Sequence, residues 1–142
     1  HTLDSTELAE KLEARSAFAQ KKINVLLQVN LSREITKSGL HDWEDILQVS
    51  ETILSGKWIK LRGLMTIPTP NIGETPTRKI YEKLRVWRDK LKQELDSAEI
   101  TELSMGMTAD FHWAIQEGAT MIRVGSAIFG ERNEDMDYPT NM

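Results

Sequence analysis

Two short segments near the C-terminal end of the chain carry residue types that together could bind a phosphate group. The first spans residues 103–111, where Ser104, Gly106 and Thr108 have the spacing of a strand that ends in a tight turn and a capped helix. Free N–H groups at the start of a helix attract anions, and a serine hydroxyl beside them adds a donor. Many turns that bind nothing use the same residue types, so this segment alone indicates a phosphate site only weakly.

The second segment, residues 122–130, repeats the arrangement. Gly125 and Ser126 follow an apolar strand and lead into one short helical turn at Ser126–Phe129. Barrels of alternating strands and helices often bind phosphate with the loops after their last two strands and the N-terminus of a short extra helix. We therefore expect the serines and glycines of the two segments to converge on one phosphate. Arg123, on the inward face of the last strand, should lie just below it.

The order of strands and helices decides whether these segments can meet. Apolar runs predict strands at residues 25–31, 61–67, 100–105 and 120–124, with the end of a further strand at residues 1–3. Helices are expected between them, because apolar residues recur there at spacings of three and four. Such alternation is typical of an α/β protein with a mostly parallel sheet and crossover helices.

Capping residues predict the limits of the helices. The expected N-caps are Asp4 (with Glu7 in a capping box), Asp42, Thr75 (followed by Pro76) and Thr108. The expected helix stops are Gly56 and Gly118, since glycine commonly follows the last helical turn.

Two architectures fit this pattern, an open doubly wound sheet and a (β/α)8 TIM-type barrel. In residues 25–31 one face is wholly apolar, whereas the other becomes polar at Gln28 and Asn30. In a barrel these two side chains would point into the lumen at the functional end, although a satisfied polar pair in an interior gives the same pattern. A barrel typically takes about 250 residues, so a chain of 142 would supply a little over half of one.

Composition excludes several classes of protein. The net charge is −4, with acidic and basic residues mixed along the chain, which argues against a nucleic-acid partner. There is no cysteine, the three histidines lack metal-ligand spacing, and no apolar run approaches the roughly 20 residues that span a membrane. We therefore expect a cytoplasmic protein without a metal site, whose polar residues 131–142 form a tail.

Four stretches carry a resemblance to a known family. They are residues 24–31 with 36–39 (Thr-Lys-Ser-Gly), residues 61–68 (Leu-Arg-Gly-Leu-Met-Thr-Ile-Pro), residues 103–110, and residues 118–130. In these stretches, and in their order, the sequence resembles the pyridoxal phosphate homeostasis proteins. The resemblance covers nearly the whole chain except the tail.

The resemblance implies a barrel of the alanine-racemase N-terminal type, of which residues 1–130 would form the later βα units. It also implies that pyridoxal 5′-phosphate (PLP) binds at the C-terminal mouth, in a protein that buffers vitamin B6 without catalytic turnover. Carried over by position, Ser104 and the turn at Gly125 and Ser126 would hold the phosphate, and Arg123 would lie near the cofactor ring. The family usually has threonine in place of Ser126, which preserves a hydroxyl.

One departure from the family concerns the lysine that binds the cofactor aldehyde. In the family this lysine lies on the first strand in a Val-Ser-Lys context, and no such stretch occurs in this chain. Lys37 belongs to a loop motif instead. Counterparts of the second and third strands are also missing, so the chain corresponds to about the last three-fifths of the domain.

Arg123 bears on whether the cofactor would be used for catalysis. PLP is the best electron sink when its pyridine nitrogen is protonated, and an always-charged guanidinium opposes that protonation. We therefore expect a non-catalytic, monomeric PLP binder. The alternatives are an amino-acid racemase, which would need a second base such as Tyr81 or Tyr138, a barrel for another phosphorylated metabolite, and a structural piece without a ligand.

Overall fold

Five strands and five helices alternate along the chain in the computed structural model, which describes residues 2–32 and 37–130. The strands are β1 (Thr2–Leu3), β2 (Ile23–Gln28), β3 (Ile59–Met65), β4 (Glu102–Met107) and β5 (Met121–Arg123). The helices are α1 (Thr6–Phe18), α2 (Trp43–Ser55), α3 (Glu74–Glu94), α4 (Phe111–Gln116) and α5 (Ser126–Phe129).

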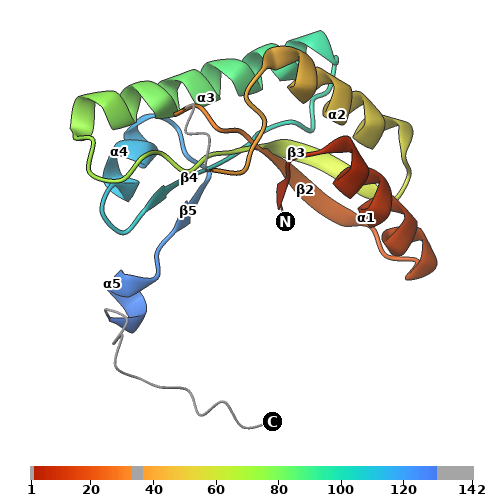
Figure 1. Cartoon of the computed structure of the whole chain (residues 1–142), viewed down its shortest axis with the longest axis horizontal. Coiled ribbons are helices and arrows are strands. Elements are labelled where there is room, and N and C mark those ends of the chain that lie inside the picture. Colours follow the sequence, from red (N-terminus) through yellow and green to blue (C-terminus); the bar gives the residue numbers. More distant parts are fainter. Residues whose placement is uncertain (1, 33–36, 131–142) are drawn as a thin grey trace, which may run out of the picture.

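The sheet is wholly parallel, and its strands lie side by side in the order in which they occur in the chain. Helices α1, α2 and α3 cover one face of this sheet (Figure 1). A doubly wound sheet places helices on both faces and reverses its strand order at a switch point. Sequential parallel strands with helices on a single face form the wall of a (β/α)8 barrel, so the barrel interpretation is confirmed.

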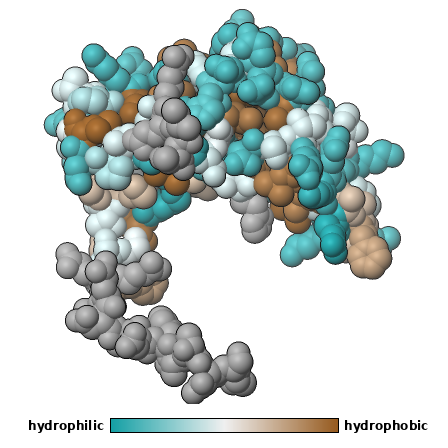
Figure 2. Space-filling view, in the orientation of Figure 1, coloured by the Kyte–Doolittle hydropathy of each residue, from teal (hydrophilic) through white to brown (hydrophobic). Residues whose placement is uncertain are grey.

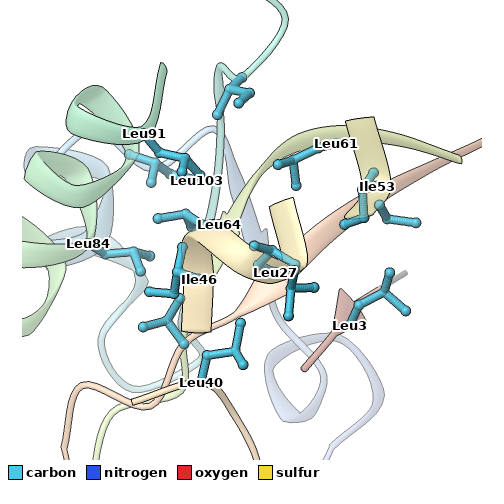
Figure 3. Packing of buried hydrophobic residues seen from close by; sticks show 14 of the residues in the cluster. Leu3, Leu27, Leu40, Ile46, Ile53, Leu61, Leu64, Leu84, Leu91 and Leu103 are labelled. Atoms are coloured by element: carbon cyan, nitrogen blue, oxygen red, sulfur yellow. The ribbon is translucent and has the colours of Figure 1, made fainter. Parts of the chain in front are cut away.

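The hydrophobic core lies between the sheet and the helices. On β2 the side chains of Val25 and Leu27 are fully buried against the helices, whereas Gln28 on the other face is only half-buried. The paired residues Leu27, Leu64 and Leu103 continue this apolar face across β3 and β4, and Ile46, Ile53, Leu84 and Leu91 meet it from α2 and α3 (Figure 3). The apolar and polar faces predicted for the second strand are therefore confirmed.

The outer surface over the helices is mostly hydrophilic, with apolar side chains gathered between them (Figure 2). Among the described residues, no helix is both long and apolar enough to cross a lipid bilayer. Among these described residues, no group of three or more histidine, cysteine or carboxylate side chains could hold a metal ion.

Three predicted N-caps are wrong. Ser5, not Asp4, caps α1, because its Oγ accepts the N–H of Leu8 at 3.2 Å. Helix α3 begins one residue before Thr75, with Gly73 as its N-cap, so Pro76 is its third residue. The N–H groups of the first helical turn have no acceptor within the helix, so a proline there costs no hydrogen bond. Thr108 does not cap α4, since β4 continues to Met107 and the helix begins only after Asp110.

Other boundaries agree or shift by about two residues. Asp42 takes the N-cap position of α2, and Gly118 follows α4 with a φ of +94°, as predicted. Gly56 also ends α2, at the C-cap. The strands β2 and β3 start earlier and end earlier than predicted. Their predicted ends followed the apolar runs, which continue beyond the last ladder pair. The predicted tail at residues 131–142 lies outside the described residues.

Candidate functional site

The C-terminal ends of β3, β4 and β5 bring the predicted site residues Ser104 and Arg123 together. Ser104 pairs with Met65 of β3 on one side and with Met121 of β5 on the other. The next pair between β4 and β5 is Met107 with Arg123, so three steps along β4 oppose two along β5. This bulge in β4 changes the relative offset of the two strands beyond Ser104.

Arg123 makes two hydrogen bonds across the sheet. Its Nη1 donates to the Oγ of Ser104 at 2.9 Å, and its Nη2 donates to the carbonyl oxygen of Thr66 at 3.0 Å. Burial lowers the pKa of the guanidinium from its ordinary value, and the nearby Tyr81 and Asp110 side chains act in the opposite direction. Because arginine starts so far above neutrality, the side chain keeps its positive charge.

Ser104 is left with a proton to donate. Its hydroxyl oxygen accepts from Arg123, so the O–H is available to a further acceptor. The side chain is buried, at 6% exposure, which limits competition from water. A fixed cation beside a hydroxyl donor is a combination that suits an anionic or electron-rich ligand atom.

Gly106 lies in the bulge, where its φ is +95°. A Cβ at this position would be 2.6 Å from the Cβ of Ala114 and 3.0 Å from the Cα of Phe111. The glycine therefore lets β4 approach α4 closely, a reason for its identity that does not involve a ligand. Its predicted role at the phosphate stays a prediction.

Gly125 and Ser126 stand apart from this cluster. Both residues are exposed, and no atom lies within 4 Å of a Cβ built on Gly125. Figure 1 shows α5 beyond the end of β5 and away from the helices that cover the sheet. The structure thus joins Ser104 to Arg123 but leaves the second predicted turn unpacked, and the phosphate roles of Gly125 and Ser126 stay predictions.

Two further residues at this end of the sheet were missed from the sequence, and a third, Tyr81, was named there only as a possible racemase base. Thr66 contributes only a carbonyl oxygen, which no side-chain pattern can reveal. Asp110 accepts the N–H of Met107 at 2.7 Å through its Oδ1 and so fixes the turn after β4. Tyr81 of α3 is fully buried behind that turn.

The hydroxyl of Tyr81 forms no hydrogen bond in the structure, although the Asp110 carboxylate and the Gly106 backbone face it. Burial raises the pKa of Tyr81 well above its ordinary value, and the nearby negative charge of Asp110 raises it further. A phenol held neutral in this way cannot serve as a general base near neutral pH.

The polar end of β2 holds a loop in place. Gln28 Nε2 donates to the carbonyl of Ser38 at 3.2 Å, and Asn30 Nδ2 donates to the carbonyl of Lys37 at 3.1 Å. Lys37 Nζ in turn donates to the carbonyl of Pro68 at 3.4 Å. A cavity of about 210 Å³ lies at the same end of the sheet as Ser104, lined by Gln28, Val29, Asn30, Lys37, Ser38 and Ile67. The two polar side chains are therefore satisfied within the fold.

Curated relatives match most of this chain but extend well beyond it. The pyridoxal phosphate homeostasis protein of Pasteurella multocida is 39% identical over 132 residues, which is 93% of this chain and 56% of the relative. The protein of the same name from Aquifex aeolicus is also 39% identical over 132 residues, 93% of this chain and 57% of the relative. The chain thus spans a little over half the length of these relatives.

Solved structures show the same fold. PipY of Synechococcus elongatus, solved with PLP bound, is 32% identical, with a TM-score of 0.82 over 90% of this chain and 58% of its own. An alanine racemase of Clostridium difficile, at 19% identity and a TM-score of 0.67, covers 94% of this chain and 34% of its own and shares the fold alone.

The family model described as the alanine racemase N-terminal domain matches residues 1–133. That range contains every described strand and helix, including the ends of β3, β4 and β5 where Arg123 meets Ser104. The chain belongs to the alanine racemase N-terminal domain family.

Proposed function

We propose that this chain binds pyridoxal 5′-phosphate with Ser104 and Arg123, as part of a barrel that serves vitamin B6 homeostasis. The observation that carries the proposal is the hydrogen bond from Arg123 Nη1 to Ser104 Oγ at the C-terminal edge of the sheet. Ligands of parallel α/β barrels bind at this edge. The relatives named for pyridoxal phosphate homeostasis, and PipY with PLP bound, support the choice of cofactor.

The donors at this edge fit the cofactor chemically. A guanidinium and a hydroxyl can hold a phosphate oxygen or the pyridine nitrogen, both of which are hydrogen-bonding groups of PLP. Gly125 and Ser126 directly follow β5 and are proposed to bind the phosphate with backbone N–H groups and the Ser126 hydroxyl. When bound, PLP supplies an electron sink for carbanion chemistry. A guanidinium at the ring nitrogen weakens that sink, which supports binding without catalysis.

The state of Tyr81 argues against a racemase that uses this residue as a base. Of the two tyrosines named as possible second bases, Tyr81 is buried with a raised pKa, and Tyr138 lies outside the described residues. The acidic net charge supports the proposed lack of a nucleic-acid partner, and the absence of cysteine supports a cytoplasmic location. A monomeric state is a further part of the proposal.

Binding is best tested with pyridoxine 5′-phosphate, which lacks the aldehyde and therefore does not react with surface lysines. Calorimetric titration of the full chain should give saturable binding, and pyridoxine, without the phosphate, should bind at least about tenfold more weakly, a difference of about 1.4 kcal/mol. Ribose 5-phosphate in competition tests for a general phosphate site. Equal affinities for the two pyridoxines, or full displacement by ribose 5-phosphate at equal concentration, would contradict the proposal.

A further inference from the structure

Strand β5 carries Arg123, but its own pairing with β4 does little to fix the register of the two strands. It is three residues long and pairs with β4 at two positions, on either side of the bulge. Met121 and Ile122 are both exposed. Because side chains alternate along a strand, a slip of one residue would turn Arg123 to the opposite face of the sheet. The contact between Arg123 and Ser104 therefore depends on the interactions that fix the start of β5 against β4.

Thr120, the residue directly before β5, is joined to β4 by hydrogen bonds of both its backbone N–H and its hydroxyl. Its backbone N–H donates to the carbonyl of Leu103 at 3.0 Å, and its Oγ1 accepts the N–H of Leu103 at 2.8 Å. The same hydroxyl donates to Oε2 of Glu102 at 2.7 Å. The hydroxyl thus acts as donor and acceptor at once toward two successive residues of β4.

The Glu102 carboxylate, which accepts this hydroxyl proton, also accepts a second hydrogen bond. The other oxygen of Glu102 accepts from Thr101 Oγ1 at 3.0 Å. The hydrogen bonds from Thr120 and then Thr101 lower the pKa of Glu102 below its ordinary value, so the side chain is ionised at neutral pH. A hydrogen bond to an ionised acceptor is about twice as strong as one between neutral groups.

We propose that Thr120 is a positioning residue, whose hydroxyl fixes the register of β5 against β4 and so places Arg123 beside Ser104. The proposal rests on the function proposed above, in which Arg123 and Ser104 hold the cofactor. Thr120 does not touch the ligand in this scheme. It pins the strand three residues before the guanidinium, and Arg123 completes the alignment through its bonds to β4 and to the carbonyl of Thr66.

The test compares one substitution that removes the hydroxyl with one that keeps it. Thr120→Val keeps the shape but removes donor and acceptor, and Thr120→Ser restores both. Affinity for pyridoxine 5′-phosphate in the full chain should fall about tenfold or more in Thr120→Val and stay within about threefold in Thr120→Ser. Thr101→Val is the matched control, because it also removes a hydroxyl donor to Glu102 but none of the bonds to β5; its affinity should stay within about threefold.

A double-mutant cycle with Arg123→Gln separates positioning from general destabilisation. If Thr120 acts through Arg123, adding Thr120→Val to Arg123→Gln should cause no further loss of affinity. Wild-type affinity in Thr120→Val, or additive losses in the double variant, would overturn the proposal. If Thr120→Val fails to fold, Glu102→Leu removes the acceptor instead and must weaken binding; unchanged affinity would overturn the proposal equally. Absence of binding in the unsubstituted chain would instead count against the proposed function.

Discussion

Arg123 on β5 donates a hydrogen bond to the hydroxyl of Ser104 on β4, two residues that are 19 positions apart and are not direct partners in the strand ladder. The bulge between the two strands makes this diagonal contact possible. Its effect is to orient the guanidinium while leaving the serine proton available. The first prediction concerns this proton.

Replacing Ser104 by alanine should weaken binding without unfolding the chain. Arg123 keeps its bond to the Thr66 carbonyl, but the ligand loses one donor and the guanidinium loses one restraint. We expect the affinity for pyridoxine 5′-phosphate to fall about threefold to tenfold, as for a hydrogen bond worth about 0.7–1.4 kcal/mol. Ser55→Ala, on the exposed end of α2, is the control for serine loss elsewhere. An unchanged affinity in Ser104→Ala would remove this residue from the site.

Gly106→Ala should destabilise the fold by more than backbone strain alone. The added methyl group would lie 2.6 Å from Ala114 Cβ, at a positive φ that costs about 1–2 kcal/mol for an L-residue. Gly73→Ala separates the two effects, because Gly73 has a similar φ of +91° with nothing within 4 Å of its Cβ. Urea unfolding should show a loss of about 1–3 kcal/mol for Gly73→Ala, from backbone strain alone. The loss for Gly106→Ala should be larger by at least about 1 kcal/mol, from the added clash. Similar losses in both variants would mean that α4 moves aside freely.

Glu13 should make the stability of the chain depend on acid pH. Its carboxylate accepts the backbone N–H groups of Lys57, Trp58 and Ile59 and so anchors α1 to the start of β3. Burial by itself would raise the pKa of Glu13, but these three hydrogen bonds outweigh it and the pKa is lowered. The folded-state pKa therefore lies below that of the unfolded chain. The carboxylate stabilises the fold above the unfolded pKa, and this contribution is lost as the pH falls through the folded pKa.

We expect Glu13→Gln to lower the free energy of unfolding at pH 7 by about 1–3 kcal/mol, the range for hydrogen bonds to charged groups. The difference from the unsubstituted chain should shrink as the pH falls below about 4. Urea unfolding at several pH values measures this directly. Glu10→Gln on the exposed side of the same helix should change the free energy by less than about 0.5 kcal/mol. A difference in Glu13→Gln that is constant with pH would contradict the assignment.

Tyr81→Phe should be close to neutral for stability. The hydroxyl is buried without a hydrogen bond, so its removal gives up no interaction and relieves the cost of burying a polar group. We expect a change within about 1 kcal/mol in either direction, measured by urea unfolding. Tyr81→Leu, which also removes ring volume from the core, should cost more. A loss above about 2 kcal/mol in Tyr81→Phe would reveal a hydrogen bond to Asp110 in solution.

The sequence predicted the fold well because its main signals are periodic. Alternating burial along β2 separated the helix-facing Val25 and Leu27 from Gln28, and the same parity placed Arg123 on the face of Ser104. Local capping was harder to predict, since Asp4 and Ser5 are both good caps and only the backbone decides between them.

The contacts that sequence reasoning missed are long-range or involve the backbone. Glu13 meets backbone N–H groups 44 to 46 residues further along the chain, and nothing in its helix marks it for that role. Thr120 looks like an ordinary first residue of the strand predicted at 120–124, although its hydroxyl bonds to the neighbouring strand. The position of the turn at Gly125 and Ser126 was predicted from motif similarity, and its distance from Ser104 depends on packing that periodicity does not describe.

The sequential order of the strands has a consequence for how the chain folds. Each new strand adds to the one made just before it, so the sheet can grow from its N-terminal side while the chain is still being synthesised. Arg123 arrives last and bonds to Thr66, 57 residues earlier, and to Ser104. Its two hydrogen bonds therefore require β3, β4 and β5 to be in place together, so the guanidinium contact reports the assembly of these three strands.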